Sequence, residues 1–81
     1  MYKRQTLLFV GATCPNCKVA VQLLDKAGIA YETVMSQENM DLCREYGVMA
    51  TPTLVITDGE NTEKYAGAQA IKQFVKSEQV G

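Results

Sequence analysis

The chain has 81 residues, enough for one domain over residues 1–81 with a small core and about 5 to 10 kcal/mol of net stability. Hydrophobic residues make up 47% and charged residues 21% of the sequence, which is typical of a folded globular domain and disfavours intrinsic disorder. Eight Lys and Arg against nine Asp and Glu give a formal net charge of -1 without a run of either sign, so neither nucleic acid nor a membrane surface is an expected partner.

Near the N-terminus a short apolar run follows Lys3 and Arg4, as it does in a secretory signal peptide. The run is too brief for such a peptide and lacks a cleavage or lipid-attachment pattern, so we expect a cytoplasmic protein. Residues 6–10 instead predict a β-strand. Because the run is continuous rather than alternating, this strand should be buried on both faces at the centre of a sheet. Residues 11–13 then form the loop that leads to Cys14.

The next segment, residues 15–27, has the pattern of an amphipathic helix. Four apolar side chains recur at helical spacing and share one face: Cys17, Ala20, Val21 and Leu24. Pro15 suits the first helical turn, where its missing N–H would have had no partner, and Gly28 is a favourable C-terminal stop.

A second strand is predicted over residues 30–35, joined to the first by a right-handed crossover that makes the two strands parallel. Residues 36–46 predict a shorter helix that ends at Gly47, and its inward-facing candidates are Leu42, Cys43 and Tyr46. We interpret Cys43 as a buried small hydrophobic residue rather than as a regulatory thiol.

The C-terminal third predicts a hairpin and a last helix. Residues 53–57 and 62–66 are β-favouring and are separated by a turn at Asp58-Gly59, so they should pair as antiparallel strands. Residues 68–77 predict a helix whose apolar side chains are Ile71, Phe74 and Val75. The order of elements is therefore β-α-β-α-β-β-α, an α/β domain.

Two cysteines, Cys14 and Cys17, stand at the start of the first predicted helix. In disulfide exchange the attacking species is the thiolate, so a redox site must lower the pKa of one cysteine and leave it accessible. The unpaired N–H groups and the dipole of a helix start favour a thiolate on Cys14, and Lys18 one turn later adds a smaller contribution. Cys17 falls on the apolar face, which shields it. We predict that Cys14 is the nucleophile and Cys17 the resolving thiol.

A Cys-x-x-Cys pair also occurs as half of a zinc or iron–sulfur site. With three cysteines and no histidine, the chain cannot build a four-ligand zinc site from these residue types, so no metal is expected. Two alternatives to dithiol chemistry stay open. One is a zinc or iron–sulfur centre that two chains share through Cys14 and Cys17, and the other is a non-catalytic interaction domain of the same fold.

Thr51 and Pro52 form the second chemical feature, directly before the strand predicted at residue 53. A proline here implies a bend in the chain. If the loop faces the dithiol, a cis Thr51-Pro52 bond would present the backbone groups of Thr51 to an extended substrate segment. Gly67, just before the last helix, would let backbone N–H groups approach a ligand or partner, or would serve a purely steric purpose.

Three segments together resemble the glutaredoxins and small thioredoxin-like proteins: Cys14-Pro15-Asn16-Cys17, the sequence Ala-Thr-Pro-Thr at residues 50–53, and Gly67. The resemblance covers nearly the whole chain. It implies a minimal thioredoxin fold, with a four-stranded mixed sheet and helices on both faces. It also implies that the first cysteine is the nucleophile and that the proline is cis.

The chain departs from both groups at particular positions. Thr13 stands where thioredoxins have a tryptophan, and Leu8 where they bury an aspartate that assists proton transfer to the resolving cysteine. Many glutaredoxins hold glutathione with a lysine three residues before the first cysteine and an Asp-containing stretch after the late glycine. Here Gly11 and the sequence Gly-Ala-Gln-Ala at residues 67–70 offer no charge. We therefore expect electrons to come from thioredoxin reductase and NADPH rather than from glutathione.

The resemblance implies a monomeric thiol–disulfide oxidoreductase without a tightly bound cofactor, which reduces protein or small-molecule disulfides and could donate electrons to an enzyme such as ribonucleotide reductase. The expected partners are a disulfide-containing protein and a thioredoxin-reductase-like donor. Six residues are the expected substrate-binding positions: Thr13, Pro15, Asn16, Thr51, Pro52 and Gly67.

Overall fold

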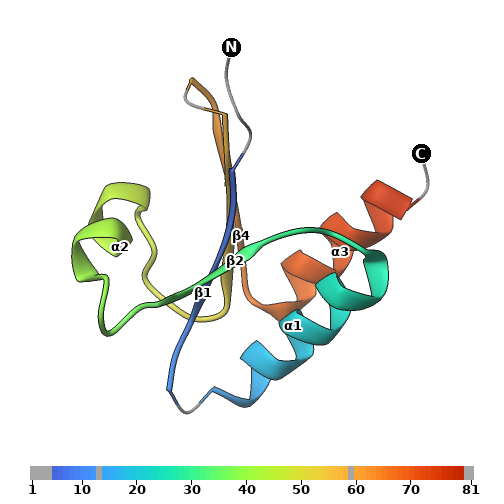
Figure 1. Cartoon of the computed structure of the whole chain (residues 1–81), viewed down its shortest axis with the longest axis horizontal. Helices are drawn as coiled ribbons and strands as arrows, with labels where there is room; N and C mark the ends of the chain where they lie inside the picture. The colour runs from blue at the N-terminus through green and yellow to red at the C-terminus, as the bar shows by residue number, and fades with distance from the viewer. Residues whose placement is uncertain (1–4, 13, 59, 80–81) are drawn as a thin grey trace.

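The computed structural model describes residues 5–12, 14–58 and 60–79. These residues form four strands and three helices in the predicted order (Figure 1). The elements are β1 (Gln5–Val10), α1 (Pro15–Ala27), β2 (Glu32–Met35), α2 (Met40–Tyr46), β3 (Thr53–Thr57), β4 (Thr62–Ala66) and α3 (Ala68–Gln79).

The strands form one mixed sheet in the order β2-β1-β3-β4. β1 pairs in parallel with β2 and antiparallel with β3, and β4 closes a hairpin with β3. Leu7, Leu8 and Phe9 of β1 are all buried. The continuous apolar run therefore lies at the centre of the sheet, as predicted, and the whole arrangement is the minimal thioredoxin fold that the sequence implied.

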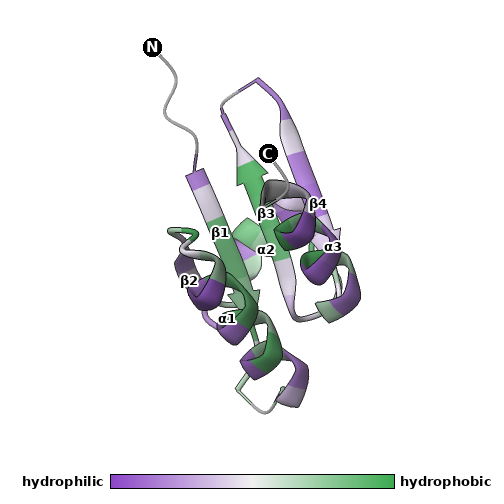
Figure 2. Cartoon of the chain, turned by 90° about the vertical axis from the view of Figure 1, so that its right-hand side faces the viewer, coloured by the Kyte–Doolittle hydropathy of each residue, from purple (hydrophilic) through white to green (hydrophobic). Residues whose placement is uncertain are grey.

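Helices cover both faces of the sheet, with α1 and α3 on one side and α2 on the other (Figure 1). The central strands β1 and β3 are hydrophobic over most of their length, whereas the edge strand β4 is largely hydrophilic (Figure 2). Successive residues of a strand point to opposite faces. Leu8 accordingly joins the core beneath α1 and α3, while Leu7 and Phe9 join a smaller cluster beneath α2.

α1 begins and ends where the sequence predicts. Its buried side chains are Cys17, Ala20 and Leu24, and Val21 is half-buried against the same core. Gly28 closes the helix in the left-handed conformation, where its N–H donates to the carbonyl of Asp25. The Ile29 N–H donates to the carbonyl of Leu24, so this closure occupies the residues directly after the helix, and β2 begins at Glu32 rather than at residue 30.

α2 is shorter than predicted, because residues 36–39 form turns and the helix begins only at Met40. The Ser36 N–H donates to the Val10 carbonyl at 2.9 Å, which continues the pairing of β2 with β1 by one residue. The Asn39 side chain then donates to the Met35 carbonyl at 2.9 Å. These two bonds hold the start of the predicted helix to the end of the sheet.

On the α2 side of the sheet, the Tyr46 ring packs edge-on against Phe9, with ring centroids 6.3 Å apart. Cys43 of α2 contacts the same cluster, and α2 lies on the face of the sheet opposite to α1 (Figure 1). Cys43 is half-buried rather than buried as predicted. Among the described residues, no helix has the length and apolar character needed to cross a membrane.

Candidate functional site

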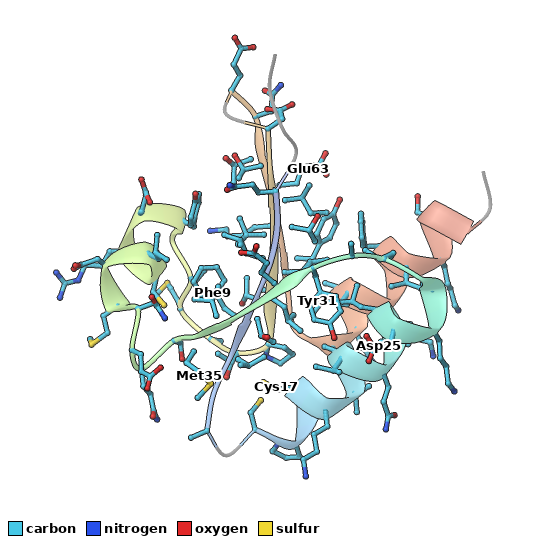
Figure 3. The ribbon with its side chains drawn as sticks, viewed as in Figure 1. Phe9, Cys17, Asp25, Tyr31, Met35 and Glu63 are labelled. Carbon is cyan, nitrogen blue, oxygen red and sulfur yellow. The ribbon has the colours of Figure 1, made fainter. Side chains whose placement is uncertain are left out.

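The two cysteines lie at the N-terminal end of α1. Cys14 precedes the helix with an extended backbone (φ -129°, ψ 100°), Pro15 occupies the first turn, and Cys17 follows within that turn. Cys14 is half-exposed, whereas Cys17 is only 6% exposed and lies at the start of α1 where the helix meets the sheet (Figure 3). Both are free thiols.

The environment of Cys14 stabilises a thiolate. Its pKa lies below the ordinary value of 9.0, mainly because the Cys17 thiol donates a hydrogen bond to the Cys14 sulfur. The side chain of Thr51 and the backbone N–H groups of Asn16 and Cys17 act in the same direction, and desolvation opposes them. The start of the helix therefore contributes as predicted, but the charge of Lys18 is not among the causes.

The environment of Cys17 has the opposite effect. Burial raises the pKa of the Cys17 thiol above 9.0, and its hydrogen bond to Cys14 raises it further because the proton is held between the two sulfurs. The backbone of Gly11 and the side chain of Thr51 act weakly against this. The pair thus contains one accessible thiol with a lowered pKa and one shielded thiol with a raised pKa.

The loop before β3 forms the other wall of the site. The Thr51-Pro52 peptide bond is cis, as the sequence predicted, and Pro52 is buried. The Cys14 Sγ donates to the Thr51 carbonyl at 3.6 Å. The Thr53 hydroxyl donates to the Ala50 carbonyl at 2.6 Å, which ties the two ends of this short loop together.

Gly67 links the end of that loop to the first turn of α3 through backbone hydrogen bonds. Its N–H donates to the Pro52 carbonyl at 2.8 Å, and its own carbonyl accepts from the Ile71 N–H at 3.1 Å in the first turn of α3. Its φ of +93° favours glycine. The Gly67 N–H is therefore engaged within the chain rather than open to a ligand, and Gly67 acts on the site through Pro52.

Gly11 is a site residue that sequence reasoning missed, because its only signal is a glycine at the end of the first strand. A Cβ at this position would lie 3.1 Å from the Thr51 Oγ1 and 3.7 Å from the Cys14 Cβ. The first distance is tighter than an ordinary contact, so glycine here lets the loop after β1 pack against Thr51.

The remaining predicted residues fall into three groups. Pro15 and Asn16 are exposed beside Cys14. Thr13 lies outside the described residues. Leu8 is fully buried, so the position under α1 that holds a carboxylate in thioredoxins is apolar here.

No group of three or more His, Cys, Asp or Glu side chains converges on a possible metal position within the part of the chain that the structure describes.

Comparisons with known proteins agree with this geometry. A family model described as a thioredoxin domain matches residues 5–78. A thioredoxin of Methanocaldococcus jannaschii is 38% identical over 64 residues, which cover 69% of this chain and 73% of that protein.

Solved structures share the fold. Thioredoxin f from spinach chloroplast superposes with a TM-score of 0.77 at 21% identity, covering 98% of this chain and 76% of that chain. The thioredoxin of Malassezia sympodialis gives a TM-score of 0.75 at 24% identity, covering 95% and 74% respectively. Family and fold support a thiol–disulfide redox function for the adjacent pair Cys14 and Cys17. The chain belongs to the thioredoxin family.

Proposed function

We propose that the protein is a thiol–disulfide oxidoreductase that reduces disulfides in a protein substrate, with Cys14 as the nucleophile and Cys17 as the resolving thiol. The observation that carries the proposal is the asymmetry of the two sulfurs. Cys14 is half-exposed with a lowered pKa, and Cys17 is buried with a raised one. Disulfide exchange needs this division of roles. The attacking sulfur must be an accessible thiolate, and the second sulfur must react only after the mixed disulfide has formed.

The reaction proceeds in two exchange steps. The Cys14 thiolate attacks one sulfur of the substrate disulfide, which forms a mixed disulfide on Cys14 and releases the other substrate sulfur as a thiolate that takes up a proton. Cys17 then loses its proton and attacks the Cys14 sulfur. The second substrate thiolate leaves, and a Cys14–Cys17 disulfide remains. The substrate has gained two electrons, which the donor restores when it reduces that disulfide.

The loop at Thr51 supports the choice of a protein substrate. Its carbonyl already accepts a hydrogen bond from the Cys14 Sγ, so a chain bound beside Cys14 runs next to this backbone. An extended segment can pair with exposed main-chain groups irrespective of its sequence. Pro15 and Asn16, exposed on the other side of Cys14, would contact the same segment.

We further propose thioredoxin reductase with NADPH as the electron donor, in a cytoplasmic, monomeric protein without a tightly bound cofactor. Glutathione carries two carboxylates and an amino group, which need charged partners. Gly11 packs against Thr51 and has no side chain to offer, and residues 68–70, at the start of α3, carry no charge. A partner reductase can instead recognise the dithiol through the surface around it. An acceptor such as ribonucleotide reductase fits the same chemistry.

Insulin reduction tests the catalytic proposal. With NADPH and thioredoxin reductase, wild-type protein should sustain turnover, Cys14→Ser should lose it, and Cys17→Ser should accumulate a mixed disulfide that mass spectrometry detects. Cys43→Ser is the matched control, because Cys43 belongs to α2, which lies on the face of the sheet opposite to α1, and it should keep wild-type activity. Undiminished turnover in Cys14→Ser would exclude the mechanism.

The donor is tested separately by replacing the first system with glutathione, glutathione reductase and NADPH. We expect turnover with thioredoxin reductase to be the faster of the two. Faster turnover with glutathione would refute the donor assignment and leave the dithiol mechanism standing. Bound zinc or iron in anaerobically purified protein, lost on substitution of Cys14 or Cys17, would instead favour a shared metal centre.

A further inference from the structure

A groove beside the dithiol is lined by residues of α1, by the loop after β1 and by β2, and its described lining does not include Thr51. Its volume is about 740 Å³, within the range of small-ligand sites. Both cysteines reach its near end, and Thr33 of the edge strand β2 lies at its far side. The mechanism proposed above uses the cysteines but assigns nothing to the rest of this groove.

One wall of the groove is a face of α1 and the other is a face of the sheet. Helical and strand periodicity therefore decide which side chains line it. On α1, Lys18 and Val21 or Gln22 recur at helical spacing and present one stripe beside the sheet, and Cys14 lies directly before the helix at the same groove. In the sheet, Val10 continues the face of Leu8, and Thr33 lies opposite Leu8 in the parallel register. β2 has β1 on one side only, so the groove is open at the sheet edge.

The charge along the groove is positive, and it comes from α1. Among the described residues that line the groove, Lys18 alone is charged, and the others are apolar or neutral. The only acidic residue of α1, Asp25, is near the other end of the helix, where it accepts a hydrogen bond from the Tyr31 hydroxyl at 3.0 Å (Figure 3). Glu32 of β2 pairs in register with Leu7 and therefore points to the opposite face of the sheet.

We propose that this groove selects protein substrates in which an apolar residue and an acidic residue lie next to the disulfide cysteine. The apolar side chain packs against Val10 and Val21, and the carboxylate pairs with Lys18. The inference rests on the proposed function and names its substrate class. A peptide joined to Cys14 has the Thr51 backbone on one side and this groove on the other, so both halves of the segment are contacted.

The test uses disulfide-bridged peptides of one sequence that differ only in an acidic, neutral or basic residue beside an apolar one. Wild-type protein should reduce the acidic peptide with a kcat/KM about twofold to fivefold above the basic one, the size expected for an exposed ion pair. Raising the ionic strength should erase the difference. Lys18→Glu should reverse the preference. Lys26→Glu changes the charge of the same helix outside the groove and should leave the ratio as in wild type.

A second pair of variants tests the apolar half. Val21→Thr keeps the shape of the side chain and adds a hydroxyl to the groove, and it should lower kcat/KM for the apolar peptide about threefold relative to a peptide with alanine at that place. Val19→Thr is the control, because Val19 is 44% exposed on α1 and does not line the groove. Each comparison is a ratio within one variant, so changes in intrinsic thiol reactivity cancel.

Hydroxyethyl disulfide, which is uncharged and too small to fill the groove, separates the two proposals. If wild-type protein reduces neither it nor the peptides, the proposed function fails. If wild-type protein reduces them but the acidic-to-basic ratio is the same in wild type, Lys18→Glu and Lys26→Glu, the groove proposal alone is refuted.

Discussion

Replacing Gly67 by alanine should lower both the stability of the fold and the activity of the site, whereas the control Gly28→Ala should lower stability alone. Gly67 has a φ of +93°, and its N–H holds the Pro52 carbonyl at 2.8 Å. An added Cβ would meet no atom within 4 Å, so the cost is purely one of backbone conformation. Gly28 provides a matched control. Its φ of +72° lies close to the left-handed helical region, its Cβ would also meet no atom, and it lies at the far end of α1 from the dithiol.

The expected magnitudes follow from the two conformations. Alanine in the left-handed region costs about 1–2 kcal/mol, and the reduced freedom of the unfolded chain returns about 0.4–1 kcal/mol, so Gly28→Ala should lose about 1 kcal/mol. Gly67→Ala lies further from any favourable region and should lose about 2 kcal/mol. At about 4–8 °C per kcal/mol for a domain of this size, the two variants differ in Tm by several degrees, and both stay folded at 25 °C.

The effect on activity distinguishes Gly67→Ala from Gly28→Ala. If alanine at position 67 relaxes its φ, the N–H turns away from Pro52 and the Thr51 carbonyl moves relative to Cys14. Misplacement of this kind lowers kcat/KM for insulin reduction, on the order of tenfold, whereas Gly28→Ala should retain the wild-type value at 25 °C. Calorimetry and the insulin assay give the two readouts. Wild-type kcat/KM in Gly67→Ala would refute the reasoning that this hydrogen bond positions the loop.

Three further predictions concern the sulfurs and the core. Thr51→Val removes a hydroxyl that stabilises the Cys14 thiolate, so the pKa of Cys14 should rise, and the pH profile of its alkylation by iodoacetamide should shift upward, while Thr51→Ser should stay near wild type. Because burial raises the pKa of Cys17 above 9.0 and position 8 supplies no carboxylate, release of thiol from a preformed mixed disulfide on Cys14 should accelerate with pH to beyond pH 9; a plateau near neutral pH would contradict this. Leu24→Ala empties a fully buried position and should lower the free energy of unfolding in urea by about 2–5 kcal/mol, whereas Val19→Ala on the exposed side of α1 should change it by less than about 0.5 kcal/mol.

The parts of the molecule that depend on local pattern were predictable. The continuous apolar run of β1 indicated a central strand, the spacing from Cys17 to Leu24 predicted the shielding of the second cysteine, and Pro15 and Gly28 marked the ends of α1. The order of elements followed from these patterns, whereas the four-stranded mixed sheet was implied by the family resemblance. The pairing of a dithiol with a Thr51-Pro52 loop also predicted the cis peptide bond that the structure contains.

The parts that depend on contacts between distant loops were not predictable. α2 begins at Met40 because Ser36 still pairs with Val10, a bond across the sheet that leaves no mark in the helical pattern of residues 36–46. Gly11 is required by its distance to Thr51, and Gly67 by its bond to Pro52. Each of these contacts joins segments that are far apart in the chain. Patterns in a single sequence predict structure that depends on neighbouring residues, and they do not predict such contacts.

The position of β1 between β2 and β3 has a consequence for how the protein is made. Cys14 and Cys17 leave the ribosome early, but β1 gains its antiparallel partner only after residues 53–57 are synthesised. Thr51, which contributes to the lowered pKa of Cys14, and Gly67, whose N–H binds the Pro52 carbonyl, are synthesised after both cysteines. The hydrogen bond from Cys17 that chiefly lowers the pKa of Cys14 can therefore form within the first turn of α1, whereas the contribution of Thr51 requires the later half of the domain.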